Sequence, residues 1–296
     1  MSKFVVITDS TSDLPLEYRE RYNVEYVKMS FNIDGREFVA DLDWNEITPK
    51  EYYDLMRKGC RSITGLVKTA EFEQKFEEAL ARGMDVLYLA CSSKLSGSLN
   101  GGKIVAEELL EKYPDRKIVC FDTLRTNLAE GLIAIKASQM AQEGKSLEEV
   151  IKTLEEDKLK YQTYATVGTL DYLRKAGRVK ATAAFFGNLF GVKPIILGDA
   201  HGNNYAYKKV KGRKTALDTV IEECVSRIRN NTEALVFVEH SDCFTDALYV
   251  KEQIIAKANP KEVVITDLGP IIGATVGPDS ITVNFYGEKV TIFGEE

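Results

Sequence analysis

Short apolar segments alternate with amphipathic segments along most of this chain, and the alternation limits what it can fold into. Three of the short segments, FVVIT (4–8), VLYLA (86–90) and ALVFV (234–238), would be apolar on both faces of a strand. Such strands occur in parallel sheets that helices cover on both sides. The sequence therefore predicts an α/β fold. The predicted strands are Phe4–Thr8, Glu25–Met29, Val86–Ala90, Lys117–Phe121, Lys193–Leu197, Tyr205–Val210, Ala234–Glu239, Val263–Thr266 and Ile281–Tyr286.

Several helix boundaries carry local signals. Thr48 and Ser146 each precede a glutamate by three residues, which is the capping-box pattern of a helix start. Pro49 follows Thr48 at the first helical position, and Pro15 marks another predicted helix start. Glycines that follow a helical pattern indicate helix ends. These are Gly59, Gly83, Gly144 and Gly177.

The chain is long enough for two domains, since 296 residues exceed the ordinary size of one. We predict an N-terminal α/β domain over 1–160, with a largely parallel sheet flanked by helices, and a mixed α/β domain over 161–296. The segment ITVNFYGEKVTIF predicts a terminal hairpin that turns at Gly287–Glu288. A cleft between two such domains is a common place for a ligand.

Composition argues against several classes of function. The net charge of −6 argues against nucleic acid as the main ligand, because phosphate neutralisation needs excess Lys and Arg. No apolar run approaches the ~20 residues of a membrane span, and the N-terminal apolar run is too short for a signal peptide. The odd cysteine count without C-x-x-C indicates buried free thiols in a reducing cytosol. Two histidines without ligand spacing argue against zinc. We therefore expect a cytoplasmic protein without a metal or other cofactor.

The segment CSSKLSGSLNGG (91–102) places hydroxyls and glycines where a predicted strand leads into a predicted helix. Such crevices bind ligands in α/β sheets, and the first turn of a helix offers unpaired N–H groups to an anion. Ser96 and Gly97 lie at the expected helix start, where the glycine allows close approach to the backbone. A carboxylate or phosphate fits these residues, but plain capping by serine explains them equally well. Neither a Walker loop nor a G-x-S-x-G nucleophile motif occurs here.

Two further polar segments have two interpretations each. ITDSTSDLP (7–15) offers Asp9 as a nucleophile or metal carboxylate, or forms a polar turn whose side chains bond the backbone. DLGPIIGATVGPDSI (267–281) predicts a loop of special backbone geometry that faces the cleft, with Thr275 as a further hydroxyl donor.

The cationic and apolar segments of the second half also have two interpretations each. GTLDYLRKAGRV (168–179) and VKGRKTALD (210–218) carry basic clusters, which either complement helix dipoles or form a docking patch for a partner. ATAAFFGNLFGVKPII (181–196) is apolar all round over most of its length, so it is either core or the lining of an apolar cavity.

These segments together, in this order, resemble the DegV family of bacterial lipid-binding proteins. The match runs from ITDSTSDLP through SSKLSGS, FDT (121–123), TLDYLRKAGRV and VKPII to GPIIGATVGP, and it covers nearly the whole chain. The resemblance implies two α/β domains with a long-chain fatty acid, such as palmitate, buried between or within them. It also implies that hydroxyl groups hold the acyl carboxylate.

The resemblance assigns roles to particular residues. The family's carboxylate-binding threonine matches Thr64, although the usual Ser-Gln-Pro does not follow it here, and the serine of its Ser-Gly pair matches Ser96. Thr275 stands where the family commonly has a histidine. Gly97 and Ser93 are supporting candidates. The candidates for the acyl pocket are Phe185, Phe186, Leu189 and Phe190.

Some family members deliver the fatty acid to a separate kinase that phosphorylates the acyl carboxylate. The resemblance therefore implies a fatty acid kinase as a partner, with Arg174, Arg178 and Arg213 as candidate docking residues. We predict a non-catalytic fatty-acid carrier that makes at most transient contact with a membrane. One alternative is an enzyme acting on a small carboxylated or phosphorylated metabolite, with Asp9 and the serines as its site. Another is a protein of this fold that binds a different lipid or none.

Overall fold

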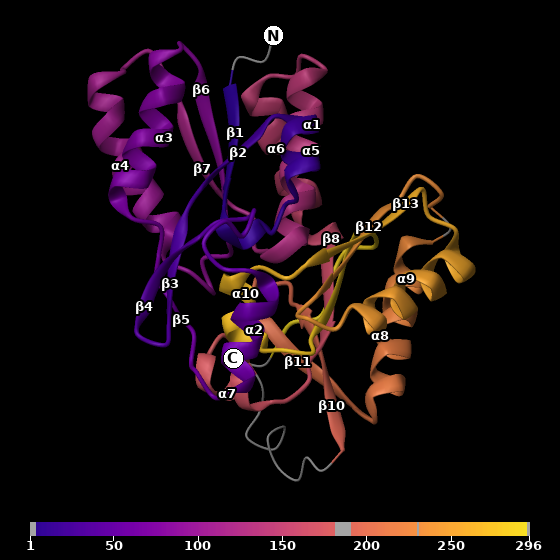
Figure 1. The fold of residues 1–296 in the computed structure, drawn as a ribbon. Coiled ribbons are helices and arrows are strands. Elements are labelled where there is room, and N and C mark those ends of the chain that lie inside the picture. The colour runs from indigo at the N-terminus through magenta and orange to yellow at the C-terminus, as the bar shows by residue number, and fades with distance from the viewer. Residues whose placement is uncertain (1–3, 181–190, 230, 295–296) are drawn as a thin grey trace.

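The structure is a computed structural model, and it describes residues 4–180, 191–229 and 231–294. Within these residues the strands form three sheets, of four, three and seven strands (Figure 1). The strands of the first two sheets lie before residue 123, and those of the third lie after residue 160. The predicted α/β fold class is confirmed, while the domain boundary near residue 160 stays a prediction.

The four-stranded sheet is parallel throughout, with the order β2-β1-β6-β7. Its central strands β1 and β6 are the FVVIT and VLYLA segments. Helices α3 and α4 lie on one side of the sheet and α1, α5 and α6 on the other (Figure 1). Tyr88 packs in the core on the first side and Leu87 in the core on the second. The elements are β1 Phe4–Asp9, α1 Leu16–Tyr22, β2 Val24–Val27, α3 Thr69–Ala81, β6 Asp85–Ala90, α4 Ser98–Lys112, β7 Ile118–Asp122, α5 Asn127–Gln142 and α6 Leu147–Asp157.

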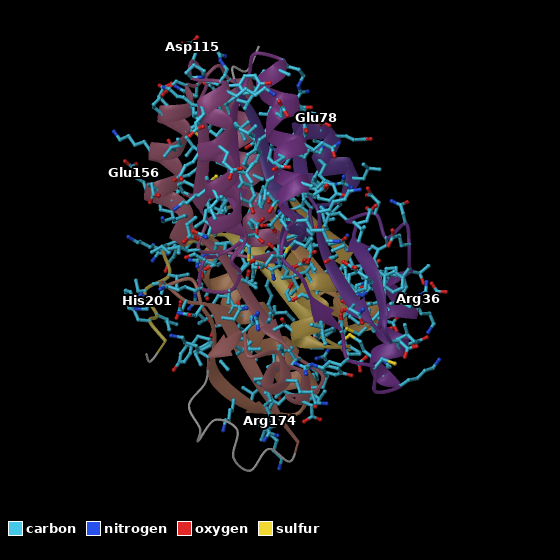
Figure 2. The ribbon with its side chains drawn as sticks, turned by 90° about the vertical axis from the view of Figure 1, so that its left-hand side faces the viewer. Arg36, Glu78, Asp115, Glu156, Arg174 and His201 are labelled. Carbon is cyan, nitrogen blue, oxygen red and sulfur yellow. The ribbon has the colours of Figure 1, made fainter. Side chains whose placement is uncertain are left out.

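The three-stranded sheet is antiparallel, with the order β4-β3-β5. The predicted strand 25–29 is divided between two sheets, because β2 ends at Val27 and β3 starts at Met29. The outer strand β4 buries Phe38 and Ala40 in the core, and Figure 2 shows the charged Arg36 on it pointing outward. The helix predicted from Thr48 and Pro49 follows, with its capping box in place. The elements are β3 Met29–Ile33, β4 Arg36–Ala40, α2 Pro49–Arg57 and β5 Ile63–Thr64.

The seven-stranded sheet is mixed, with the order β13-β12-β14-β8-β10-β11-β9. Val236 and Val238 on β12 face the core under α8 and α9, whereas Phe237 between them faces α5. Helix α5 therefore packs against both large sheets. The elements are β8 Tyr161–Thr166, α7 Asp171–Ala176, β9 Val179–Lys180, β10 Val192–Gly198, β11 Asn204–Lys211, α8 Arg213–Ile228, β12 Leu235–His240, α9 Phe244–Ala258, β13 Glu262–Asp267, α10 Pro270–Val276 and β14 Ile281–Tyr286. Two short 3-10 helices complete the described part, η1 Ser10–Ser12 and η2 Lys158–Lys160.

Two predictions for the second half are wrong. The expected hairpin after Gly287 does not form, because β14 already pairs with β12 on one side and β8 on the other. Both edges of β14 are occupied, and residues 287–294 contain no strand. The segment 267–281 is not one loop, since it contains helix α10 with Pro270 at its first position.

Two general properties of the described residues concern membrane spans and cysteines. None of the described helices is both long and apolar enough to cross a bilayer. The five cysteines, all within the described ranges, are free thiols, namely Cys60, Cys91, Cys120, Cys224 and Cys243.

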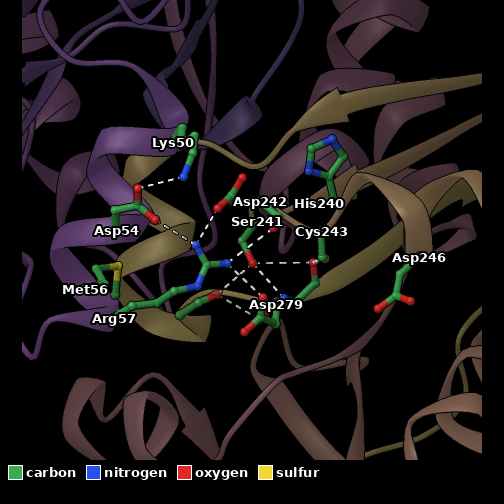
Figure 3. Close-up of polar contacts among 12 residues, drawn as sticks. Lys50, Asp54, Met56, Arg57, His240, Ser241, Asp242, Cys243, Asp246 and Asp279 are labelled. Carbon is green, nitrogen blue, oxygen red and sulfur yellow. Dashed lines mark hydrogen bonds and ion pairs between the residues drawn. The ribbon is translucent and has the colours of Figure 1, made fainter.

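Helix α2 is held against the third sheet by polar contacts. Arg57, its last residue, contacts Asp242 after β12 and donates to the Asp279 carboxylate before β14 at 2.8 Å (Figure 3). The hydroxyls of Tyr52 and Tyr53 donate to backbone carbonyls at the start of α10, at 2.8 and 2.6 Å. These contacts fix α10 against the first half of the chain.

We predict that Arg57→Gln lowers the free energy of unfolding by about 1 kcal/mol, because it leaves Asp242 and Asp279 without their shared cation. Urea denaturation measures the loss, which salt should diminish. The matched control is Arg82→Gln, which removes an exposed ion pair with Glu25 inside the first half of the chain. Equal effects of the two substitutions would contradict a special role for Arg57.

Candidate functional site

The carboxyl ends of β1 and β6 open onto a pocket of about 350 Å³. Its walls come from β5, from the loop that leads into α4 and from α10, so both halves of the chain contribute. Of the predicted ligand-binding residues, Thr64, Ser96, Gly97 and Thr275 line this one pocket. The cleft expected between the halves of the chain therefore contains a cavity at the predicted residues.

Just over half of the pocket wall is apolar. Helix α10 presents Ile272 and Val276 to it, one turn apart on the same helix face. Met29 and Cys91 are almost fully buried at their places in the lining, and burial raises the pKa of the Cys91 thiol well above its ordinary value. The apolar lining residues are Met29, Leu66, Cys91, Leu95, Ile271, Ile272 and Val276.

Hydroxyl groups supply donors in the same pocket. Thr64 and Thr275 are half-buried, and neither side chain has a hydrogen-bond partner among the described residues. The Ser96 hydroxyl lies 3.0 Å from the Ser98 hydroxyl and accepts from the Ser98 backbone N–H at 3.2 Å. Because these hydroxyls are neutral and at least two are unpaired, they can donate to an anionic group without burying an opposite charge.

The other residues of the CSSKLSGSLNGG segment have different places. Gly97 is the N-cap of α4, and a Cβ there would lie 3.3 Å from a methyl group of Leu66. Ser93 is exposed and outside the pocket lining, with its backbone N–H 3.2 Å from the Asp122 carboxylate. Ser92 is buried and donates to the Gly202 carbonyl at 2.7 Å. Ser96 is thus the serine of this segment that lies in the lining.

A second pocket of about 260 Å³ adjoins the first and shares Thr64, Arg178 and Thr275 with it. Its character is different, because three cations and one carboxylate line it. These are Arg61, Lys175, Arg178 and Asp171. The hydroxyl end of the first pocket therefore faces a polar, cationic space.

The three candidate docking arginines differ in their surroundings. Arg174 and Arg178 are exposed, and Figure 2 shows Arg174 at the lower tip of the molecule. Arg213 is half-buried and its guanidinium pairs with Asp246 at 2.7 Å. Arg178 reaches both pockets, so it lies nearest the candidate head-group site. Their role in docking stays a prediction.

The predicted acyl-pocket residues Phe185, Phe186, Leu189 and Phe190 lie outside the described residues. The apolar wall that the structure describes comes instead from residues that sequence reasoning did not select. Only α10 carried a usable signal, since Ile272, Thr275 and Val276 recur at helical spacing inside a segment that its glycines and prolines mark as a loop. Met29 and Leu66 have no local pattern that distinguishes them from ordinary core residues.

Asp9 has the surroundings of a structural residue. It is fully buried, and its carboxylate accepts from the Thr11 backbone at 2.9 Å, the Tyr88 hydroxyl at 2.9 Å and the Cys91 backbone at 3.2 Å. This is the polar-turn interpretation of ITDSTSDLP. No group of His, Cys, Asp and Glu in the described ranges could hold a metal ion.

The Thr11 hydroxyl connects Asp9 to a second buried acid. Its Oγ1 lies 2.6 Å from an Asp9 oxygen and 2.7 Å from a Glu130 oxygen. One hydroxyl has only one proton, so one carboxyl must supply its own. Burial, followed by the charge of Asp9, raises the pKa of Glu130 well above its usual range, so Glu130 is the protonated partner.

Comparison with known proteins identifies the family. Residues 3–288 match the family described as "Uncharacterised protein, DegV family". The chain belongs to the DegV family. It is 39% identical over 288 residues to a DegV domain-containing protein of Clostridium perfringens, covering 97% of this chain and 99% of that one.

Solved DegV-like structures extend the comparison. A DegV family protein of Thermus thermophilus, described for its fatty acid binding, is 28% identical with a TM-score of 0.86, over 97% of this chain and all of the other. A stearic-acid-binding protein of Eubacterium ventriosum is 25% identical with a TM-score of 0.83, over 96% and 98% of the two chains. The resemblance found in the sequence motifs is thus confirmed for the family and the fold.

We predict that Asp9→Asn lowers the free energy of unfolding by about 3 kcal/mol, because the amide N–H₂ would face a backbone N–H in either orientation. Thermal or urea unfolding measures the loss. The control Asp122→Asn removes a half-buried carboxylate at the end of β7, a strand of the same sheet, and should cost about 1 kcal/mol. An Asp9→Asn protein as stable as the wild type would favour a reactive role for Asp9 over a structural one.

Proposed function

We propose that this protein binds a long-chain fatty acid, with the acyl chain along the apolar wall and the carboxylate at Thr64, Ser96 and Thr275. One observation carries the proposal: hydroxyls without partners and an apolar wall line the same pocket at the start of α4. The fatty acid binding of the Thermus thermophilus and Eubacterium ventriosum proteins supports it.

The two parts of the site contribute differently to affinity. Burial of each methylene is worth about 0.8 kcal/mol, so the acyl chain supplies most of the free energy of binding. A hydrogen bond to a charged group contributes about 1.5–3 kcal/mol, so the hydroxyls orient the ligand and select an acid. The pocket volume lies at the lower end of the range of about 300–1,000 Å³ for small-molecule sites.

We further propose that the protein carries the fatty acid without transforming it and presents it to a separate fatty acid kinase in the cytoplasm. Arg178 at the junction of the two pockets supports a cationic docking site near the carboxylate, and Arg174 and Arg213 remain further candidates. The free cysteines agree with a reducing compartment. Contact with a membrane would be transient.

A second function is favoured by the cationic neighbouring pocket alone. Arg61, Lys175 and Arg178 would suit a small carboxylated or phosphorylated metabolite on which an enzyme of this fold could act. Such a ligand would occupy the polar pocket and leave the apolar wall of the first pocket without a function. The identity of the bound molecule therefore separates the two proposals.

Organic extraction of the purified protein followed by mass spectrometry should yield long-chain fatty acids in near-stoichiometric amount. After delipidation, added palmitate or stearate should bind, and each methylene removed should weaken binding about fourfold, as the burial free energy requires. Recovery of no acyl chain, together with no uptake of added fatty acid, would rule out the carrier proposal.

We predict that Thr64→Val and Ser96→Ala each weaken fatty-acid binding about tenfold or more, because each removes a donor to a carboxylate. Titration calorimetry with delipidated protein measures the loss, and the unliganded melting temperatures should stay close to wild type. The matched control is Ser93→Ala, which removes a nearby serine hydroxyl outside the pocket lining. Unchanged affinity in both pocket variants would place the carboxylate elsewhere.

A further inference from the structure

Two buried carboxyl groups meet where the halves of the chain join. Asp13 ends η1 in a left-handed conformation, with φ of 49°, and is 5% exposed. Glu239 lies on β12, an interior strand of the seven-stranded sheet, and is fully buried. The Asp13 carboxyl is within hydrogen-bond range of the Glu239 carboxyl. The Asp13–Glu239 pair therefore joins the turn after β1 to the core of the third sheet.

The two carboxyls share too few donors for two negative charges. One oxygen of Glu239 accepts from the Thr282 hydroxyl and the Asn284 amide, both at 2.5 Å. Apart from each other and the backbones of Gly269 and Leu128, the other Glu239 oxygen and both Asp13 oxygens have no hydrogen-bond partner in the described structure. Two ionised carboxylates in contact, without water or a cation, would carry a large electrostatic cost.

The groups around the pair do not supply a positive charge. Glu130 on α5 faces Asp13, and Tyr53 on α2 faces both carboxyls. Asp43 and Asp267 line a cavity next to Asp13, and their ion-pair partners are Arg19 and His240 respectively. In the described residues no ion pair reaches Asp13 or Glu239. Arg19 and His240 are thus engaged by other carboxylates, and a proton is the remaining way to compensate the pair.

Burial raises the pKa of Asp13 well above its ordinary value; the charge of Glu239 and the contact between the carboxyls raise it further, and the Gly269 backbone opposes part of the rise. Burial also raises the pKa of Glu239 to about 7, although Thr282, Asp13 and Asn284 hold it down through hydrogen bonds. Glu239 accepts from two side chains of other residues, whereas the one donor to Asp13 from another residue is the Gly269 backbone. The negative charge therefore belongs on Glu239 and the last proton on Asp13.

We propose that Asp13 and Glu239 share a proton through the neutral pH range. This proton stabilises the packing of the turn after β1 against the start of α10, and so stabilises the wall of the candidate pocket. Asp13 lies directly over Gly269, the N-cap of α10, where a Cβ would come 1.9 Å from its carboxyl oxygen. Two residues before Asp13, Thr11 lines the pocket, and two residues after Gly269, Ile271 does so too. Loss of the proton leaves two negative charges between the turn after β1 and the start of α10, and this weakens the packing of the two segments.

A route for the proton exists on the far side of the pair. A cavity of about 190 Å³ lies beside Asp13, lined also by Trp44, Asp267 and Gly269. The proton can exchange through this cavity without passing the acyl pocket. The pair therefore responds to the pH of the surroundings whether or not a ligand is bound. The consequence for the ligand rests on the proposed function, whereas the presence of the proton does not.

Infrared spectroscopy in heavy water tests the proton directly, because the carbonyl stretch of a protonated carboxyl lies apart from that of a carboxylate. At neutral pH, Asp13→Asn should remove one component of the protonated band. The matched control is Asp41→Asn. Burial opposes ionisation there, but hydrogen bonds from Asn45 and the Asp43 backbone lower the pKa of Asp41, so its loss should leave the band unchanged. An intact band in Asp13→Asn would overturn the proposal.

The pH dependence of unfolding gives a second readout. A carboxyl whose pKa is raised in the folded state contributes most to stability at a pH below its unfolded pKa of about 4. This contribution is lost as the pH rises toward the folded pKa. Each such group makes the unfolding equilibrium constant rise about tenfold per pH unit in that window. For Glu239 the window ends at about 7. Asp13→Asn and Glu239→Gln should each flatten this rise, and a wild-type slope in both variants would contradict the shared proton.

Release of a bound fatty acid tests the coupling to the pocket. In the wild type the rate of palmitate release to lipid vesicles should increase as the pH rises above neutral, and in Asp13→Asn it should stay slow and independent of pH. A wild-type pH dependence in Asp13→Asn would overturn the coupling. If no palmitate binds at any pH, the proposed function fails, and the infrared band alone then decides whether the proton is held.

Discussion

The Asp9 carboxylate holds together the ends of two neighbouring parallel strands, and the candidate pocket is built on that contact. Asp9 ends β1, and its oxygens accept from Tyr88 on β6 and from the Cys91 backbone just after it. The residues on either side of this contact, Thr11 and Cys91, both line the pocket. A buried carboxylate with all its donors in place fixes two loops that would otherwise be free to move. The shape of the pocket thus depends on a hydrogen-bond network in and beneath its wall.

Polar contacts also position the wall that comes from the second half of the chain. Tyr52 and Tyr53 reach the start of α10, and the Ser92 hydroxyl reaches the Gly202 carbonyl. Such contacts are satisfied in one arrangement only, whereas apolar contacts tolerate sliding. They bring α10 with Thr275 opposite β5 with Thr64, although these residues are far apart in the sequence. The Asp13–Glu239 pair lies in the same contact region between the two halves of the chain, so its proton would affect the pocket.

The elements that could be predicted from the sequence are those with strong local signals. The apolar runs of β1 and β6 follow from burial on two faces. The capping boxes at Thr48 and Ser146 satisfy backbone N–H groups at the starts of their own helices. The divided strand at Lys28 and the short helix α10 could not be predicted, because neighbouring strands and buried contacts determine them. The same reason accounts for the hairpin that does not form, since the pairing of β14 on both sides is a long-range property.

The candidate site was predictable in part. The position of Ser96 at a strand-to-helix crossing follows from general physical rules, but these rules left capping and anion binding equally good. The resemblance to the DegV family favours anion binding and adds Thr64, which has no distinguishing local pattern; both assignments stay predictions. The apolar wall was missed where it depends on packing, as at Met29 and Leu66. A wall assembled from four separate chain segments leaves no local pattern for any one of them.

A crystal structure of the protein with its bound fatty acid tests the central claim most directly. The account predicts an acyl chain along Met29, Ile272 and Val276, with carboxylate oxygens within hydrogen-bond distance of the Thr64 and Ser96 hydroxyls. A chain bound outside this pocket, or a carboxylate that contacts neither hydroxyl, would contradict it.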